Sequence, residues 1–247
     1  MPACVPVLIS FSDGQGGHRG DKTPDAEDLA VLDRIAKATP HSSSPCFQML
    51  FRDGPWGDTY RSGYCSGTTH VHHFYRPRTL FGVAALRQAV LEPRVRWGAS
   101  MMLTATALKL TRMMRFMSDG IGRIQNGVIY FPSLSRETNP EHLLEIAKGQ
   151  VVKLATSIVV DPRTAIISTS SATDLRGLPD NSVDYVFVDP PFGANLQYSE
   201  LNFIWESWLR VFTNAKPEAV VSNQQNKKLD DYTGLMKRSF REFFTGL

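Results

Sequence analysis

Hydrophobic residues recur at helical spacing over most of this 247-residue chain. Two of these stretches carry clear start signals: Pro77 suits the first turn of a helix, and Asn139 followed by Pro140 suits the start of another. The stretch 39–76 is rich in Ser, Gly, Pro and aromatic residues, and we expect it to be irregular. The predicted helices cover about 25–38, 77–90, 100–117, 139–154, 199–211 and 231 onwards.

Two short apolar runs, near 164–169 and 183–188, have the length and composition of buried strands. Each is followed by an acid, Asp174 after the first run and Asp189 after the second. In open α/β sheets, ligands bind at the carboxyl ends of the strands. We therefore expect 155–195 to form adjacent parallel strands, with both carboxylates facing one cleft.

The second run ends in a tetrapeptide that cannot continue a strand: Asp189, Pro190, Pro191 and Phe192. Proline has no N–H to donate to a neighbouring strand, and its ring fixes φ, so the chain must turn here. The turn leaves a carboxylate, a rigid carbonyl and an aromatic ring together. These groups suit a flat ring with an exocyclic amino group, because the oxygens can accept its two N–H bonds. The alternative is a proline-stiffened strand exit with an acid at a helix N-cap.

Several stretches of the chain resemble the large adenine-specific DNA methylases that often carry a zinc-ribbon insertion. The resemblance extends from about residue 25 to the end and is densest from 174 to 232. It implies a partial Rossmann-like sheet of the S-adenosylmethionine-dependent methyltransferases, in an α/β fold with a mostly helical N-terminal region. The matching stretches are VDPPFGANLQYSELNFIWESW over 188–208, 211–220, 67–90 and 130–137.

The resemblance also implies roles for single residues. Asp189, Pro190, Pro191 and Phe192 would hold a base that is flipped out of DNA, and Asp174 would meet the adenine of S-adenosylmethionine. The reaction implied is methyl transfer to a base amino group, with adenine N6 the expected target and cytosine N4 the alternative.

Three residues that follow the tetrapeptide are further candidates for the base pocket: Tyr198, Glu200 and Asn202. Their alternative role is simply to begin the helix predicted at 199–211. The sequence alone leaves both readings open.

The glycine-rich turn that holds the methionine part of the cofactor in such enzymes is missing. The best lookalike, Phe11–Gly17, is followed by residues that do not open a helix, which favours a polar surface loop. The acid that would bind the cofactor ribose is not identifiable either. We therefore expect a fragment, the middle and target-base portion of a longer enzyme, with another chain or an upstream segment supplying the glycine turn. Weak or absent binding of S-adenosylmethionine by this chain follows.

Three regions are predicted from these patterns. Residues 1–76 form an irregular segment with one helix, 77–154 form a helical, basic region, and 155–247 form the partial methyltransferase core.

The stretch from Arg76 to Arg123 contains nine basic residues and two acids. A solvated helix face is the ordinary explanation of such a cluster, and a surface that contacts DNA phosphates is the functional one. Three of the cations recur every third residue and would share one helix face: Lys109, Arg112 and Arg115.

The cysteines and histidines predict neither a disulfide framework nor a metal site. Cys4, Cys46 and Cys65 form no CxxC pair, so a zinc ribbon is not expected. The cluster of histidines at 70–73 lacks a second ligand pair at zinc spacing.

No apolar run reaches membrane-spanning length and no cleavable signal is evident, so a cytoplasmic protein without a membrane partner is expected.

The leading prediction from sequence is a DNA amino-methyltransferase specific for adenine, or the part of one that holds the target base. Two alternatives remain open. Methylation of RNA amino groups uses the same Pro-Pro-aromatic device. A non-catalytic fragment that binds nucleic acid would explain the missing glycine turn.

Overall fold

The computed structural model describes residues 4–12, 19–38, 42–51, 54–55, 65, 67–117, 122–157, 165 and 167–246. Helices dominate these residues, and the strands form two short antiparallel pairs. In chain order the elements are β1 (Ile9–Ser12), β2 (Arg19–Lys22), α1 (Ala26–Lys37), β3 (Leu50–Phe51), β4 (Gly54–Pro55), η1 (Val71–Phe74), α2 (Pro77–Leu91), α3 (Arg96–Thr106), η2 (Leu108–Leu110), α4 (Pro140–Ser157), α5 (Tyr198–Leu209) and α6 (Leu229–Gly246).

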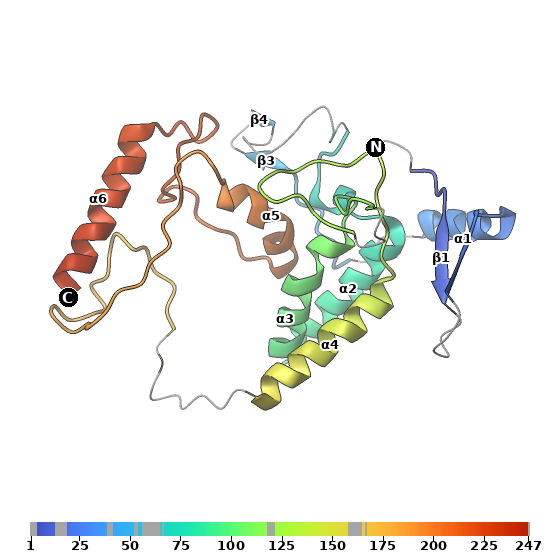
Figure 1. The fold of residues 1–247 in the computed structure, drawn as a ribbon, viewed down its shortest axis with the longest axis horizontal. Coiled ribbons are helices and arrows are strands. Elements are labelled where there is room, and N and C mark those ends of the chain that lie inside the picture. The colour runs from blue at the N-terminus through green and yellow to red at the C-terminus, as the bar shows by residue number, and fades with distance from the viewer. Residues whose placement is uncertain are drawn as a thin grey trace.

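The helical bundle consists of α2, α3 and α4, with α5 packed against α3 (Figure 1). Helices α2 and α4 approach so closely that a Cβ on Gly82 would lie 2.7 Å from the Cβ of Pro140. The indole of Trp208, from α5, is 1% exposed and donates a hydrogen bond of 2.8 Å to the hydroxyl of Tyr75. This contact joins two segments 133 residues apart in the sequence, so the bundle core is closed by long-range packing.

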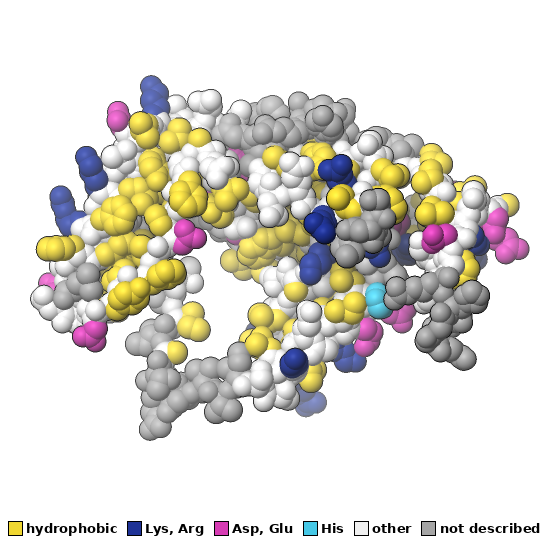
Figure 2. Space-filling view, in the orientation of Figure 1, with side chains coloured by type: hydrophobic (Ala, Val, Ile, Leu, Met, Phe, Trp, Pro, Cys, Tyr) yellow, Lys and Arg dark blue, Asp and Glu magenta, His cyan; other side chains and the backbone are white. Residues whose placement is uncertain are grey.

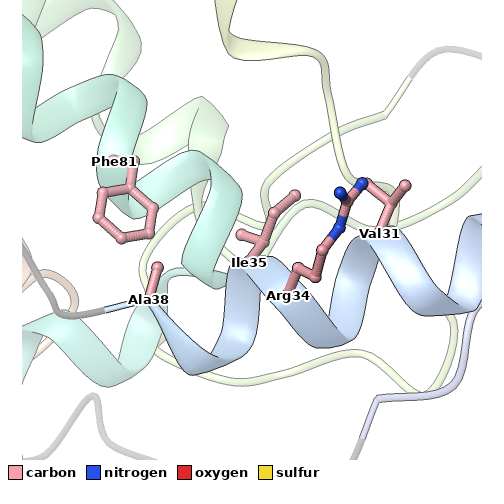
Figure 3. Close-up of a pocket in the computed structure, with 5 residues that line it drawn as sticks. All are labelled: Val31, Arg34, Ile35, Ala38 and Phe81. Atoms are coloured by element: carbon pink, nitrogen blue, oxygen red, sulfur yellow. The ribbon is translucent and has the colours of Figure 1, made fainter.

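The N-terminal residues lie at the edge of the bundle. Helix α1 begins with a capping box. The side chain of Asp25 accepts hydrogen bonds from backbone N–H groups of the first turn, and the side chain of Asp28 accepts one from the backbone N–H of Asp25. The backbone N–H of Asp28 is the main reason that the pKa of Asp25 falls to about 2. A shallow hollow of about 450 Å³ lies where Phe81 of α2 faces the last turns of α1 (Figure 3). Its lining is mostly apolar and suggests no chemistry.

The remaining C-terminal residues form what we call the α6 unit, residues 171–192 and 213–246. Helix α6 stands apart from the bundle in the view of Figure 1. Backbone N–H groups of 181–183 bond to carbonyls at the end of α6, and the hydroxyl of Tyr232 near its start bonds to the carbonyl of Pro191. The chain between these anchors is therefore extended along α6, in the direction opposite to the helix.

The expected partial Rossmann-like sheet is wrong. Among the described residues there is no parallel sheet, and neither residues 165 and 167–169 nor the run 183–188 belongs to a strand. Large apolar side chains of these stretches point to solvent: Ile167 is 96% exposed, Tyr185 76% and Phe187 82%. An apolar run becomes a strand only where neighbouring strands pair with its backbone. Here the second run instead follows α6, and Figure 2 shows hydrophobic side chains gathered over this part of the molecule.

The predicted helix over 100–117 is wrong in its bounds. Helix α3 begins at Arg96 and ends at Thr106, and a single 3₁₀ turn follows. Beyond it the chain pairs with other segments, because the N–H of Arg112 donates to the carbonyl of Phe74 at 2.7 Å. The other predicted helices are confirmed by α1, α2, α4, α5 and α6. None of the helices in the described residues combines the length and the apolar character needed to cross a membrane.

Candidate functional site

The tetrapeptide Asp189–Phe192 lies on an exposed loop between the extended chain beside α6 and the start of α5. The Asp189 carboxylate is exposed, and the Phe192 side chain is 64% exposed. The Tyr232 hydroxyl donates to the carbonyl of Pro191 at 2.8 Å. The carbonyl of Pro191 thus has a partner within the protein, and the acceptors expected from the sequence are the carboxylate of Asp189 and the carbonyl of Pro190.

The rest of this loop is held by hydrogen bonds to the chain around Val221. The N–H of Val221 donates to the carbonyl of Gly193 at 3.2 Å, and the side-chain amide of Gln197 donates to the carbonyl of Val221 at 3.1 Å. Gly193 has a φ of +59°, a conformation that favours glycine. The exposed ring of Phe192 therefore stands on a backbone that is fixed on both sides, by Tyr232 before it and by Val221 after it.

A buried polar network supports the start of α5. The carboxylate of Glu218 accepts bonds from the N–H of Ser199 at 2.9 Å, from its hydroxyl at 2.6 Å and from the amide of Gln225 at 2.8 Å. The ammonium of Lys227 donates to the carbonyls of Ala215 and Glu218, both at 2.6 Å. This network fixes the segment 215–227 against α5, and the loop that carries Phe192 rests on that segment.

The three further candidates for the base pocket have different surroundings. Glu200 is fully buried, so its carboxylate is not accessible to a ligand in this conformation. The side-chain oxygen of Asn202 accepts a bond from the indole N–H of Trp205 at 3.3 Å. Tyr198, at 42% exposure, is the most exposed of the three, and Asn202 is half-buried.

Asp174 lies elsewhere on the α6 unit, and its carboxylate is already paired. Arg176 donates to its two oxygens at 2.7 and 2.5 Å, and these bonds lower the pKa of Asp174. Glu242 holds this loop by accepting the N–H of Leu175 at 2.9 Å. Glu242 and Tyr232, the two anchors on α6, are ten residues apart, which is about 15 Å along a helix. The premise that adjacent strands bring Asp174 and Asp189 to one cleft is wrong.

The described residues do not fit S-adenosylmethionine. Within the lookalike turn Phe11–Gly17, residues 13–17 lie outside the described residues, but its flanks are β1 and β2, paired antiparallel with Ser12 opposite Arg19. The segment thus connects two strands of a hairpin, whereas a cofactor turn leads from a strand into a helix. The carboxylate of Asp174 is taken by Arg176. No step involving the cofactor can be assigned to these side chains.

The basic residues between Arg76 and Arg123 differ in their exposure and in their partners. Lys109 and Arg115 are exposed, but Arg112 is 6% exposed, with its guanidinium 4.7 Å from the ring centre of Phe131. Their predicted common helix face is wrong, because α3 ends before all three. Arg78 is paired with Glu137 at 3.1 Å. These contacts give Arg112 and Arg78 partners within the protein, and DNA contact by Lys109 and Arg115 stays a prediction.

The histidines at 70–73 pack against one another. The ring centres of His72 and His73 are 4.3 Å apart, and that of His70 lies 5.5 and 5.3 Å from them. Burial and the neighbouring rings lower the pKa of His72, and they lower that of His73 to about 4. Within the described part of the chain no three His, Cys, Asp or Glu side chains are arranged to hold a metal ion.

Sequence reasoning missed the residues that position the loop. The loop is held by Tyr232, Val221 and Gln197, and Glu218 supports it. None of these residues lies in a sequence motif that predicts such a contact. The only local sequence signal for this turn was Gly193, whose backbone is left-handed in the structure.

Comparison with protein-family models, curated proteins and solved structures finds no match for this chain.

Proposed function

We propose that this chain is the base-holding part of an amino-methyltransferase that acts on DNA, with adenine as the target base. The observation that carries the proposal is the exposed ring of Phe192, three residues after the exposed carboxylate of Asp189, on a loop fixed by Tyr232 and Val221. The resemblance of this loop to the adenine-specific DNA methylases supports it. S-adenosylmethionine, the methyl donor of this proposal, is bound by groups other than the described residues.

The two side chains have separate roles. The ring of Phe192 stacks on a base that has left the DNA helix, and stacking on an aromatic side chain is worth about 1–3 kcal/mol per base. The carboxylate of Asp189 accepts a hydrogen bond from the base amino group. Its negative charge also stabilises the positive charge that develops on that nitrogen during methylation.

The proposal is tested by measuring binding of oligonucleotide duplexes with one bulged base. A bulged adenine is compared with a bulged purine, which lacks the amino group but keeps the ring. We expect the adenine duplex to bind more tightly. Phe192→Ala should weaken binding of both duplexes about tenfold or more, since stacking serves both rings. Asp189→Asn should reduce the preference for adenine, because the amide is a weaker acceptor for the amino group.

Two exposed residues of the α6 unit provide matched controls. Phe244→Ala removes a ring that is 82% exposed on α6, and Asp184→Asn removes a charge five residues before Asp189. Neither control should change the affinity or the preference. If Phe192→Ala and Phe244→Ala bind both duplexes equally well, the aromatic ring does not hold a base and the proposal is wrong.

A non-catalytic protein that binds nucleic acid is the second candidate. The observation in its favour is the poor fit of the described residues to the cofactor. Transfer of a labelled methyl group from S-adenosylmethionine to DNA by this chain alone would exclude it. Binding of the bulged duplexes without any transfer, even with every other part of the enzyme supplied, would favour it.

A further inference from the structure

A second group of polar residues lies along the first turns of α6. The structure contains a hollow of about 480 Å³ whose lining includes Lys216, Lys227 and Arg238. One acid, Asp231, stands against these three cations, and Leu235 lies among the lining residues as an apolar surface. Because Asp231, Leu235 and Arg238 are spaced four and three apart on α6, they share one helix face.

Among the described residues, two of the cations have no partner for their charged groups. Within the described residues, neither the ammonium of Lys216 nor the guanidinium of Arg238 forms an ion pair or a side-chain hydrogen bond. Lys227 differs, since its ammonium closes the loop 215–218 through two carbonyls. The carboxylate of Asp231 accepts the backbone N–H of Lys228 at 2.8 Å. The groups left for a ligand are therefore mainly donors with positive charge.

Asn214 adds to this donor set. Its side-chain oxygen accepts the N–H of Lys216 at 3.1 Å, so its amide NH₂ is the end that remains for a ligand. An ammonium, a guanidinium and an amide that line one hollow from two different segments match the several oxygens of a phosphate group. A carboxylate ligand has two oxygens and would use fewer of these donors.

We propose that this hollow binds a phosphate group through Lys216, Arg238 and Asn214. Two sources share that chemistry, a free nucleotide and the backbone of a nucleic acid. The neighbouring residue Tyr232 holds the loop of Phe192, so a backbone phosphate bound here would lie close to the proposed base site. The inference does not rest on the proposed function, because phosphate binding is measured without a flipped base and without methyl transfer.

The test compares two double variants that remove the same charge. Lys216→Gln with Arg238→Gln changes the hollow, and Lys237→Gln with Arg241→Gln changes two exposed cations of α6 outside its lining. Binding of inorganic phosphate and of adenosine 5′-monophosphate is measured by calorimetry. Binding of a fully paired 12-base-pair duplex is measured by fluorescence anisotropy at several salt concentrations.

We expect the first double variant to bind at least one of these ligands tenfold more weakly than the second does. Loss confined to phosphate and the nucleotide identifies a free nucleotide as the ligand. Loss of duplex affinity, with a salt slope reduced by about one, identifies a backbone phosphate. Equal affinities of the two double variants in every arm would show that only general charge attraction acts, and the proposal would be overturned. Failure here leaves the bulged-base test of Phe192 unaffected.

Discussion

The helical bundle and the α6 unit differ in how far they bury their large apolar side chains. In the bundle Phe74 and Trp208 are at most 1% exposed. Along the extended chain of the α6 unit, Tyr185 and Phe187 are 76% and 82% exposed. Within the described residues, the main hydrophobic cluster takes its members from the bundle and the segments packed on it, and none comes from the α6 unit. The bundle is thus held by apolar burial, and the α6 unit by hydrogen bonds between loops and one helix.

This difference separates what stabilises the chain from what is available to ligands. The bundle is built on apolar burial, whereas the α6 unit presents a carboxylate, an aromatic ring and two cations that have no ion-pair or side-chain hydrogen-bond partner among the described residues. Binding groups commonly lie on loops that a scaffold positions. Four predictions test the comparison, beginning with the one that has the largest effect.

Trp208→Ala should lower the free energy of unfolding by about 3–5 kcal/mol, because it empties a buried site. It also leaves the hydroxyl of Tyr75 without the hydrogen bond that the indole donates. Phe187→Ala, in the α6 unit, should change the same quantity by less than about 0.5 kcal/mol, since the ring is already in solvent. Urea unfolding followed by circular dichroism measures both. Equal losses would mean that the two regions do not differ in how they are stabilised.

Acid should destabilise the bundle through its histidines. Folding lowers the pKa of His72, and it lowers that of His73 to about 4, mainly because burial disfavours the charged ring. The unfolded chain therefore binds more protons than the folded chain between about pH 6.5 and pH 4. The contribution of these two histidines to stability is present above the unfolded pKa of 6.5 and is lost as the pH drops through this window.

His73→Gln is the variant that tests this explanation. Urea midpoints measured from pH 7.5 to pH 4.5 should fall less steeply for His73→Gln than for the wild type, because one buried proton acceptor is gone. An identical fall in both proteins would assign the acid sensitivity to other groups.

The helices could be predicted from the sequence because their signals are local. Asp25, Pro77 and Asn139 each mark a helix start that the structure confirms. The error over 100–117 has a physical cause, since a backbone bond from Arg112 to Phe74 replaces helical bonding that the sequence pattern permits. The local spacing of hydrophobic residues carries no information about a hydrogen-bond partner 38 residues away.

The strands and the site show the same limit. The apolar run 183–188 has strand composition, but a strand exists only with a neighbour, and along this stretch the neighbour is α6. The turn at Asp189–Phe192 could be predicted because proline chemistry is local. Its support by Tyr232 and Val221 could not, because those residues follow about 30–40 positions later and meet the loop only in the folded chain.

Tyr232→Phe tests whether a single hydrogen bond stabilises the α6 unit without affecting the bundle. It removes the bond to the carbonyl of Pro191 and keeps the ring, so the free energy of unfolding should fall by about 0.5–1.5 kcal/mol. Hydrogen exchange should rise around residues 189–193 and stay unchanged in α2 and α3. Tyr185→Phe, which alters an exposed hydroxyl of the same unit, serves as the control. Faster exchange throughout the bundle would show that the two regions are not separately stabilised.

Asp174→Asn should have the smallest effect of the four. The variant weakens the pair with Arg176, but both side chains are exposed, at 44% for Asp174 and 87% for Arg176, and exposed pairs contribute little because water and salt screen them. The lowered pKa of Asp174 adds stability only above its unfolded pKa, and that contribution is lost as the pH falls through the folded value. Urea midpoints of variant and wild type should therefore agree at pH 7.

The same variant probes the role that the sequence resemblance assigns to Asp174, since a carboxylate that meets the cofactor would change the affinity for S-adenosylmethionine. Calorimetry should detect no tight binding by either protein, because the chain lacks the glycine-rich turn and the ribose-binding acid of such a site. Binding by the wild type that Asp174→Asn abolishes would restore Asp174 to the cofactor site and would place part of that site on the α6 unit.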